Sequence, residues 1–180
     1  MKIWKHFCTI TNHKMLVMKG CFRVGLYRQG LLHDMSKYGY TEFSLGCKYY
    51  QGTESPHNGE RRAYGYSLAW LHHKGCNKHH LEYWTDYGPG KEFGLIGMKM
   101  PKKYVIEMFI DRVSASKNYQ KEAYTDASAW EYYERSKSHY ALHPDTQKLL
   151  EELLWMIKEQ GEESVYYYIK NIVLAKDFSY

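Results

Sequence analysis

The residues best suited to metal chemistry in this sequence are a histidine and an aspartate side by side, His33 and Asp34. They follow two leucines, and Lys37 comes three residues after the aspartate. If this segment is helical, His33 and Lys37 lie one turn apart on the same side, with Asp34 one step round. An imidazole and a carboxylate that reach one cation favour zinc, iron, manganese or nickel. The pair alone also fits the exposed end of a helix, so its meaning depends on the other histidines.

A dense group of histidines follows later in the chain. Four of the ten histidines fall within nine residues. They are His72, His73, His79 and His80. The first pair ends one predicted helix and the second opens the next, so the two pairs could converge across the turn at Gly75. Histidine clustering of this density is typical of metal binding. Cys76 leaves a second interpretation open, a small zinc site of cysteine and histidine, although its spacing matches no standard zinc finger.

His13 is a further candidate ligand on a predicted helix. Its neighbours at helical spacing are Ile10, Leu16 and Val17, which place it on an apolar face. A histidine in such a position is also compatible with a core residue whose ring is bonded to a backbone carbonyl. The position of His13 therefore predicts burial, and a metal would be one reason for it.

Asp111 carries a stronger signal because it lies in an apolar stripe. Tyr104, Met108 and Ala115 share its side of the predicted helix. A carboxylate buried among such residues requires a paired cation or a metal, because burying it bare is very costly. The cation could be a metal ion or an arginine, and the helix favours neither. The candidate arginines are Arg23, Arg28 and Arg61.

The fold class predicted from the apolar pattern is all-α. The chain has 180 residues, the size of one domain, and 44% of them are hydrophobic, which is enough for a core. Gly20 and Gly25 are expected to interrupt the first helix, and residues 88–100 are expected to form a loop that could act as a lid. The predicted helices are about 2–25, 31–38, 41–50, 60–73, 79–87, 102–117, 129–136, 144–160 and 162–174.

The positive charge of the chain is concentrated near the His33–Asp34 pair. The net charge is +5, and residues 1–40 hold seven lysines and arginines against one acid. A positive field there favours an anionic small molecule, such as a phosphate ester, as the partner. Arg23, Arg28 and Lys37 are the candidate substrate-binding residues. A nucleic acid would use the same charge, but the sequence has no recognised nucleic-acid-binding motif.

We expect a cytoplasmic protein. No apolar run approaches the length of a membrane span, and the first residues do not have the pattern of a signal peptide. The four cysteines are scattered without a paired spacing, which favours reduced thiols, although two disulfides remain an alternative.

The order of these candidates along the chain resembles that of a known superfamily. His13, the His33–Asp34 pair, the paired histidines and Asp111 follow the H…HD…H…H…D order of the HD-domain superfamily of metal-dependent phosphohydrolases. His33 to Lys37 matches its HD-x-x-K form. The segment from His79 to Glu82 resembles the paired histidines of its di-metal members. The whole chain also looks like a group of short bacterial and phage proteins of unknown function.

The resemblance implies one HD-like domain over residues 1–180, a helical bundle around a central metal site. Its metal-site helices would span residues 2–118, and C-terminal helices would span 127–175. One or two divalent ions of iron, manganese, zinc or nickel would be bound. The first would be held by His13, His33, Asp34 and Asp111. The second would be held by one of His72 and His73 and by one or both of His79 and His80.

The activity that the resemblance implies is hydrolysis of a phosphate ester, such as a nucleotide, by water that a metal activates. Asp34 would bridge the metals or orient the water. Lys37 would neutralise the phosphate. Glu82 would act as a general base or fix a histidine tautomer. Two alternatives remain: a di-iron oxygenase of the same fold that uses dioxygen to cleave C–C or C–P bonds, and a non-catalytic binding module that metal stabilises.

Overall fold

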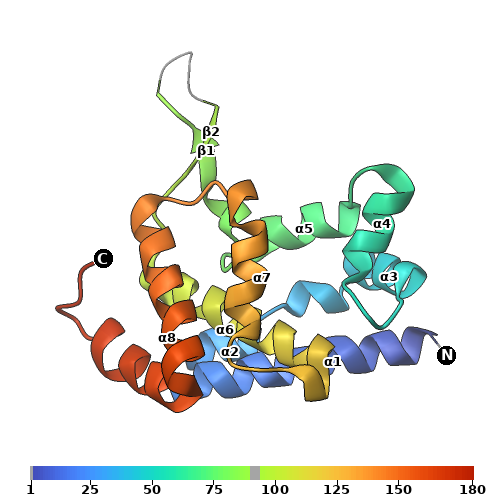
Figure 1. Ribbon diagram of the computed structural model, residues 1–180. Helices are drawn as coiled ribbons and strands as arrows, with labels where there is room; N and C mark the ends of the chain where they lie inside the picture. Colours follow the sequence, from blue (N-terminus) through green and yellow to red (C-terminus); the bar gives the residue numbers. More distant parts are fainter. Residues whose placement is uncertain (1, 90–93) are drawn as a thin grey trace.

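The protein is built almost entirely of helices, so the predicted all-α class is confirmed with one small addition (Figure 1). The computed structural model describes residues 2–89 and 94–180. The α-helices are α1 (Lys2–Arg23), α2 (Tyr27–Leu32), α3 (Tyr40–Tyr49), α4 (Pro56–Tyr64), α5 (Leu68–Cys76), α6 (Lys102–Gln120), α7 (Ser128–Ser136) and α8 (Pro144–Tyr168). The addition is an antiparallel hairpin of β1 (Thr85–Tyr87) and β2 (Leu95–Gly97), in which Asp86 lies opposite Ile96.

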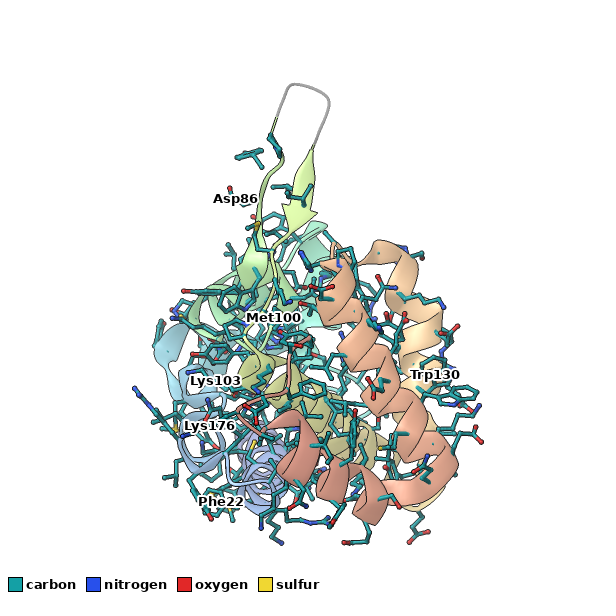
Figure 2. All side chains as sticks on the ribbon, turned by 90° about the vertical axis from the view of Figure 1, so that its left-hand side faces the viewer. Phe22, Asp86, Met100, Lys103, Trp130 and Lys176 are labelled. Atoms are coloured by element: carbon teal, nitrogen blue, oxygen red, sulfur yellow. The ribbon has the colours of Figure 1, made fainter. Side chains whose placement is uncertain are left out.

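Short turns of tighter or wider helix complete the secondary structure. The 3₁₀ turns are Met35–Tyr38, Leu81–Trp84, Lys121–Ala123 and Lys137–His139, and a π-helical turn, Ile169–Val173, follows α8. The hairpin projects from the helical body, with Asp86 on it (Figure 2). Among the described residues, no helix combines the length and the apolar character that crossing a bilayer would need.

The hydrophobic core is centred on α6, which packs against α1, α7 and α8. Val105, Ile106, Phe109 and Ile110 are fully buried on α6 and occupy more than one side of it. The facing side of α8 is a run of buried leucines that continues to Ile157. Each such side chain contributes about 1.5–3 kcal/mol when it leaves water. The candidate ligand Asp111 therefore projects from the most firmly packed helix of the protein.

Gly20 does not interrupt α1, contrary to the expectation. It lies where three helices approach closely, since a Cβ atom there would be 2.6 Å from Cγ2 of Ile110 and 2.8 Å from the hydroxyl of Tyr166. The glycine is needed for close packing, and α1 remains helical through it. Gly25, with a φ of 83°, is left-handed and lies just beyond the end of α1, where glycine is favoured.

The expected helix over residues 31–38 is interrupted at His33 and Asp34, and only a 3₁₀ turn, Met35–Tyr38, follows the break. The helix α2 ends at Leu32, His33 is extended with a ψ of 127°, and Asp34 is left-handed with a φ of 54°. Aspartate is one of the few residues that enter this region readily, because its short side chain bonds locally. Lys14 on α1 fixes the bend by donating hydrogen bonds of 2.8 Å to the carbonyls of Leu31 and His33.

Two further helical predictions needed correction. The expected helix 60–73 is divided at Gly65, where a φ of 81° ends α4. Ser67 then begins α5 by accepting a hydrogen bond from the amide of Trp70, and the buried Glu60 accepts one from the hydroxyl of Ser67. The expected helix 79–87 is instead a turn at His79 and His80, the 3₁₀ turn Leu81–Trp84, and β1. Part of the expected lid over 88–100 is β2, and residues 90–93 of it lie outside the described residues.

Candidate metal centre

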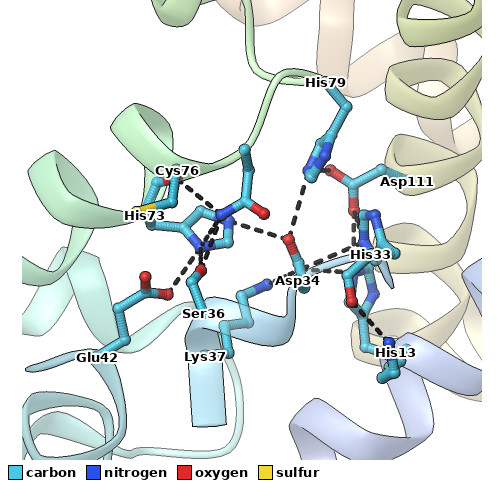
Figure 3. Close-up of polar contacts among 12 residues, drawn as sticks. His13, His33, Asp34, Ser36, Lys37, Glu42, His73, Cys76, His79 and Asp111 are labelled. Atoms are coloured by element: carbon cyan, nitrogen blue, oxygen red, sulfur yellow. Dashed lines mark hydrogen bonds and ion pairs between the residues drawn. The ribbon is translucent and has the colours of Figure 1, made fainter. Parts of the chain in front are cut away.

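Asp34 lies at the centre of a cluster of histidines that comes from four separate segments (Figure 3). Its Oδ2 atom is 3.2 Å from Nε2 of His33 and 3.7 Å from Nε2 of His13. Its Oδ1 atom is 3.2 Å from Nε2 of His73 and 3.4 Å from Nε2 of His79. The bend at the left-handed residue is therefore what carries the carboxylate into the space between α1, α5 and α6.

Two groups of potential ligands share this carboxylate. Within each group the donor atoms all lie within 4.8 Å of one another. The first group is His13, His33, Asp34 and Asp111, and the second is Asp34, His73, His79 and His80. Imidazole nitrogens together with carboxylate oxygens suit zinc, iron, manganese and nickel. The cluster thus contains two groups of side chains, with Asp34 in common, that could hold metal ions.

Several polar atoms at the centre of the cluster are buried and have no hydrogen-bond partner among the described residues. They are Oδ1 of Asp34 and Nε2 of His33, His73, His79 and His80. Leaving a buried polar atom without a partner costs about 1–3 kcal/mol, so such atoms are rare in folded proteins. Here five of them converge on the two ligand groups. Bound cations would satisfy all five, so the residues fit metal ions.

Two buried glutamates lie within hydrogen-bond distance of Nδ1 atoms of the clustered histidines. Oε1 of Glu107 lies 3.0 Å from Nδ1 of His33 and 3.2 Å from Nδ1 of His79. Oε2 of Glu42 lies 2.7 Å from Nδ1 of His73. A ring that donates its Nδ1 proton to a carboxylate presents a free Nε2 lone pair to a metal. Although Glu107 also groups with His33 and His79 as a third possible ligand set, its distances suit hydrogen bonds that orient the two rings.

The carboxylates of the cluster are ionised at neutral pH. Burial alone would raise the pKa of Asp34, but His33, Lys37 and His73 outweigh burial and hold this pKa well below its ordinary value. Burial is likewise outweighed at Asp111, mainly by its hydrogen bond with His13, so that its pKa is also well below the ordinary value. The cluster therefore presents negative charge to any cation that enters.

Without metal, part of that negative charge is balanced by protons on histidines. Burial would lower the pKa of His79, but the nearby carboxylates of Asp34 and Glu107, at 3.4 and 3.2 Å from its ring nitrogens, outweigh burial and raise the pKa to about 10. The pKa of His33 is also raised, because Asp34 outweighs the effect of burial. Cations that bind here would have to displace these protons.

The candidate ligands do not all reach the cluster. Nδ1 of His72 lies 2.7 Å from Glu42, its side chain is 42% exposed, and it belongs to neither ligand group that shares Asp34. Cys76 is exposed, with its sulfur 3.9 Å from Nε2 of His72, and it is also outside these groups.

The three predicted substrate-binding residues lie in different places. Lys37 donates a hydrogen bond to Asp34 and lines the cavity described below. Arg23 is the last residue of α1, where it forms ion pairs with Glu162 and Glu163, and it does not line that cavity. Arg28 on α2 is exposed and is also absent from the cavity wall.

A cavity of about 530 Å³ opens beside the cluster. Four members of the two ligand groups line it: His13, His73, His80 and Asp111. Glu82, proposed from the sequence as a general base, is half-buried and also lines it. The lining also includes residues that were not predicted as site residues, among them His6, His57, Arg61 and Arg112. The cluster is therefore accessible to a small molecule.

Together these features define a predominantly helical protein with a buried cluster of histidines and carboxylates that could hold metal ions. The chain belongs to DUF5662, a family of unknown function, whose model matches residues 2–156. That match includes every residue of the cluster, from His13 to Asp111, and ends within α8. No curated protein and no solved structure matches the chain.

Proposed function

We propose that this protein is a metal-dependent hydrolase that cleaves a phosphate ester, such as a nucleotide, with two divalent cations that share Asp34. The single observation that carries the proposal is the pair of ligand groups joined by this carboxylate beside the cavity. Two cations held about 3.5–4 Å apart are the arrangement with which many phosphatases stabilise both the attacking and the leaving oxygen.

The order of the ligands along the chain supports placing the protein in the HD-domain superfamily. The two groups draw their members in that order, from His13, His33 and Asp34, then His73, His79 and His80, and finally Asp111. Of the first histidine pair, His73 is the member whose Nε2 atom points at Asp34. Of the second pair, both His79 and His80 contribute.

When bound, the cations would lower the pKa of a coordinated water from 15.7 toward about 7 and polarise a phosphoryl oxygen. Lys37 would then neutralise the phosphate from the cavity wall. Burial would lower the pKa of Lys37, but Asp34 and Asp111 outweigh burial and raise it, so the ammonium stays charged across the physiological range. A fixed positive charge beside the reacting phosphate stabilises charge that develops in the transition state.

Glu82 is our candidate for the group that moves a proton. It follows His80 by two residues, lines the cavity and has no ion-pair partner within the described part of the chain. A carboxylate that is not tied to a cation can accept a proton from water or return one to the leaving oxygen. Lys37 and Asp34, by contrast, are committed to each other by a hydrogen bond.

The test combines elemental analysis with an activity screen. We expect about two transition-metal ions per chain and release of phosphate from at least one member of a panel of phosphomonoesters and phosphodiesters. Chelation should abolish the activity and metal should restore it. Glu82→Gln should keep its metal and lose most of the activity. A protein that holds two ions yet hydrolyses no ester on the panel would contradict the proposal.

One observation also favours a di-iron oxygenase as a second candidate. The two ligand groups together contain five histidines and two aspartates, a nitrogen-rich set that suits iron. The two candidates differ in their need for oxygen. Hydrolysis should proceed equally under argon and in air with several divalent metals, whereas an oxygenase should be active with iron alone and should consume dioxygen. If chelation lowers the melting temperature but neither activity is found, the protein would be a non-catalytic binding module that metal stabilises.

A further inference from the structure

Among the residues that the structure describes, two arginines in the cavity wall have no counterion. Arg61 on α4 and Arg112 on α6 both line the cavity, and neither makes an ion pair within the residues that the structure describes. Two arginines outside the cavity wall behave differently, since Arg23 pairs with Glu162 and Arg62 pairs with Glu54. Arg112 is half-buried and Arg61 is exposed, so both guanidinium groups can be reached by an anion that enters the cavity.

The guanidinium of Arg112 is held by aromatic rings. Its Cζ atom lies 5.0 Å from the ring centre of Tyr140 and 5.8 Å from that of Tyr133. A long hydrogen bond of 3.4 Å joins Nη1 to the hydroxyl of Tyr140, while Nε is buried without any partner among the described residues. Stacking on aromatic rings fixes the plane of a guanidinium and leaves its N–H edge free for a carboxylate or phosphate.

Arg61 is stacked in the same manner near the second ligand group. Its Cζ atom lies 5.6 Å from the ring centre of Trp70, and Nη1 donates a hydrogen bond of 3.0 Å to Asn58. The ring of Trp70 in turn lies 4.8 Å from that of His80. One indole therefore contacts both a metal-ligand candidate and a cation of the cavity wall.

The acids of the cavity do not neutralise these arginines. Glu42 is bonded to His73, and Asp111 lies 2.9 Å from Nε2 of His13. Glu54 is paired with Arg62. Glu82 is the remaining carboxylate of the cavity wall, and it forms no ion pair with either arginine. The cavity thus keeps two positive groups that are free to bind an anion.

We propose that Arg61 and Arg112 form a second anion-binding site in the cavity, next to the two-cation centre. The substrate would then be a phosphate ester that carries a second anionic group, either another phosphate or a carboxylate. The cations would receive the scissile phosphate, and the two arginines would receive the second group through charge-assisted hydrogen bonds. This inference rests on the proposed function and narrows its substrate class.

The test measures the binding of four small anions to the metal-loaded protein by calorimetry. The probes are inorganic phosphate, pyrophosphate, tripolyphosphate and phosphoglycolate, so that a second phosphate and a carboxylate are compared directly. We expect at least one two-group anion to bind about tenfold more tightly than phosphate, the gain from one added charge-assisted contact. Arg112→Gln and Arg61→Gln should each remove most of that gain and leave the affinity for phosphate unchanged.

Matched variants separate this site from simple chelation of the metals. Arg112→Lys keeps the charge and should retain part of the gain, whereas Arg135→Gln, at an exposed arginine outside the cavity, should change nothing. Melting temperatures and metal contents are measured for each variant. If Arg112→Gln does not fold, Arg61→Gln still decides the outcome.

Three results would distinguish the fate of the arginine site from that of the proposed hydrolase. If two-group anions still bind more tightly than phosphate in both Gln variants, the gain in affinity comes from the metals, and the proposed arginine site is contradicted. Phosphate that binds only with metal, while no two-group anion binds more tightly, would also end the arginine site but leave the proposed function standing. Two-group anions that bind equally well without metal, through the arginines, would support the site and argue against the two-cation hydrolase.

Discussion

The Oε1 atom of Glu107, on α6, lies 3.0 Å from Nδ1 of His33. This contact joins α6 to the bend that carries Asp34. The same oxygen is 3.2 Å from Nδ1 of His79, so one carboxylate orients a ring in each of the two ligand groups. Burial would raise the pKa of Glu107, but the two histidines outweigh burial and lower it. An ionised glutamate in this position increases the basicity of both rings toward a metal.

We therefore expect Glu107→Gln to weaken metal binding without unfolding the protein. The amide keeps the shape of the side chain but removes the charge, and losses of about 10- to 100-fold in affinity are usual when such a partner is lost. Competition with a chromogenic chelator would measure the change. Glu134→Gln, at an exposed ion pair with Lys137, is the matched control and should have no effect. Unchanged metal affinity in Glu107→Gln would mean that the glutamate serves packing alone.

The neighbouring histidines His72 and His73 offer a comparison within one helical turn. Both rings are bonded to Glu42 through Nδ1, at 2.7 Å in each case. Only His73 directs its Nε2 atom at Asp34, whereas His72 is partly exposed. His73→Gln should lose at least one metal ion, and His72→Gln and Cys76→Ser should retain the full content in elemental analysis. Metal loss from His72→Gln or Cys76→Ser would instead support the zinc site of cysteine and histidine.

The metal-free protein should be most stable near pH 6.5. The pKa of His79 is raised to about 10. Its contribution to the free energy of unfolding is therefore complete below pH 6.5, the ordinary pKa of histidine, and is lost as the pH rises toward 10. Burial, together with the positive charge of Lys37, lowers the pKa of His57 to about 3 and that of His6 to about 4. The contribution of these two histidines to the free energy of unfolding is complete above pH 6.5 and is lost as the pH falls toward their lowered pKa values.

Metal should change the alkaline side of this pH profile. Ions that occupy Nε2 of His79 replace the proton there, so the loss of stability above pH 6.5 should disappear in the metal-loaded protein. Melting temperatures from pH 4 to 10, with and without a chelator, would measure both curves. A chelated protein whose stability is flat from pH 6.5 to 10 would show that the carboxylates do not hold a proton on His79.

The sequence was sufficient to select most of the cluster because its members are chemically unusual where they stand. Asp111 interrupts an apolar stripe, and four histidines fall within nine residues, so burial and clustering could both be anticipated. The distinction between His72 and His73 could not be predicted from the sequence. Adjacent helical residues point about 100° apart, and only the packing of α5 on α3 decides which ring turns inward.

The expectations that failed depended on backbone conformation and on longer-range contacts. The bend at Asp34 was read as helix because its left-handed conformation is imposed by tertiary contacts, including the hydrogen bonds from Lys14. Glu107 was overlooked although it lies four residues before Asp111, on the same face of one helix, which was the available signal. Glu42 gave no comparable signal, since its burial arises from the packing of α3 against α5.

Asp34→Asn should separate the role of the carboxylate from that of the backbone. Asparagine also accepts the left-handed conformation that Asp34 adopts, whereas alanine at a φ of 54° would add strain. The amide removes the negative charge that both ligand groups share, so we expect the metal content to fall from about two ions to at most one and hydrolysis to be lost. Asp34→Ala should lose the metal as well but with a lower melting temperature. If Asp34→Asn kept both ions and its activity, the shared carboxylate could not be the bridge between them.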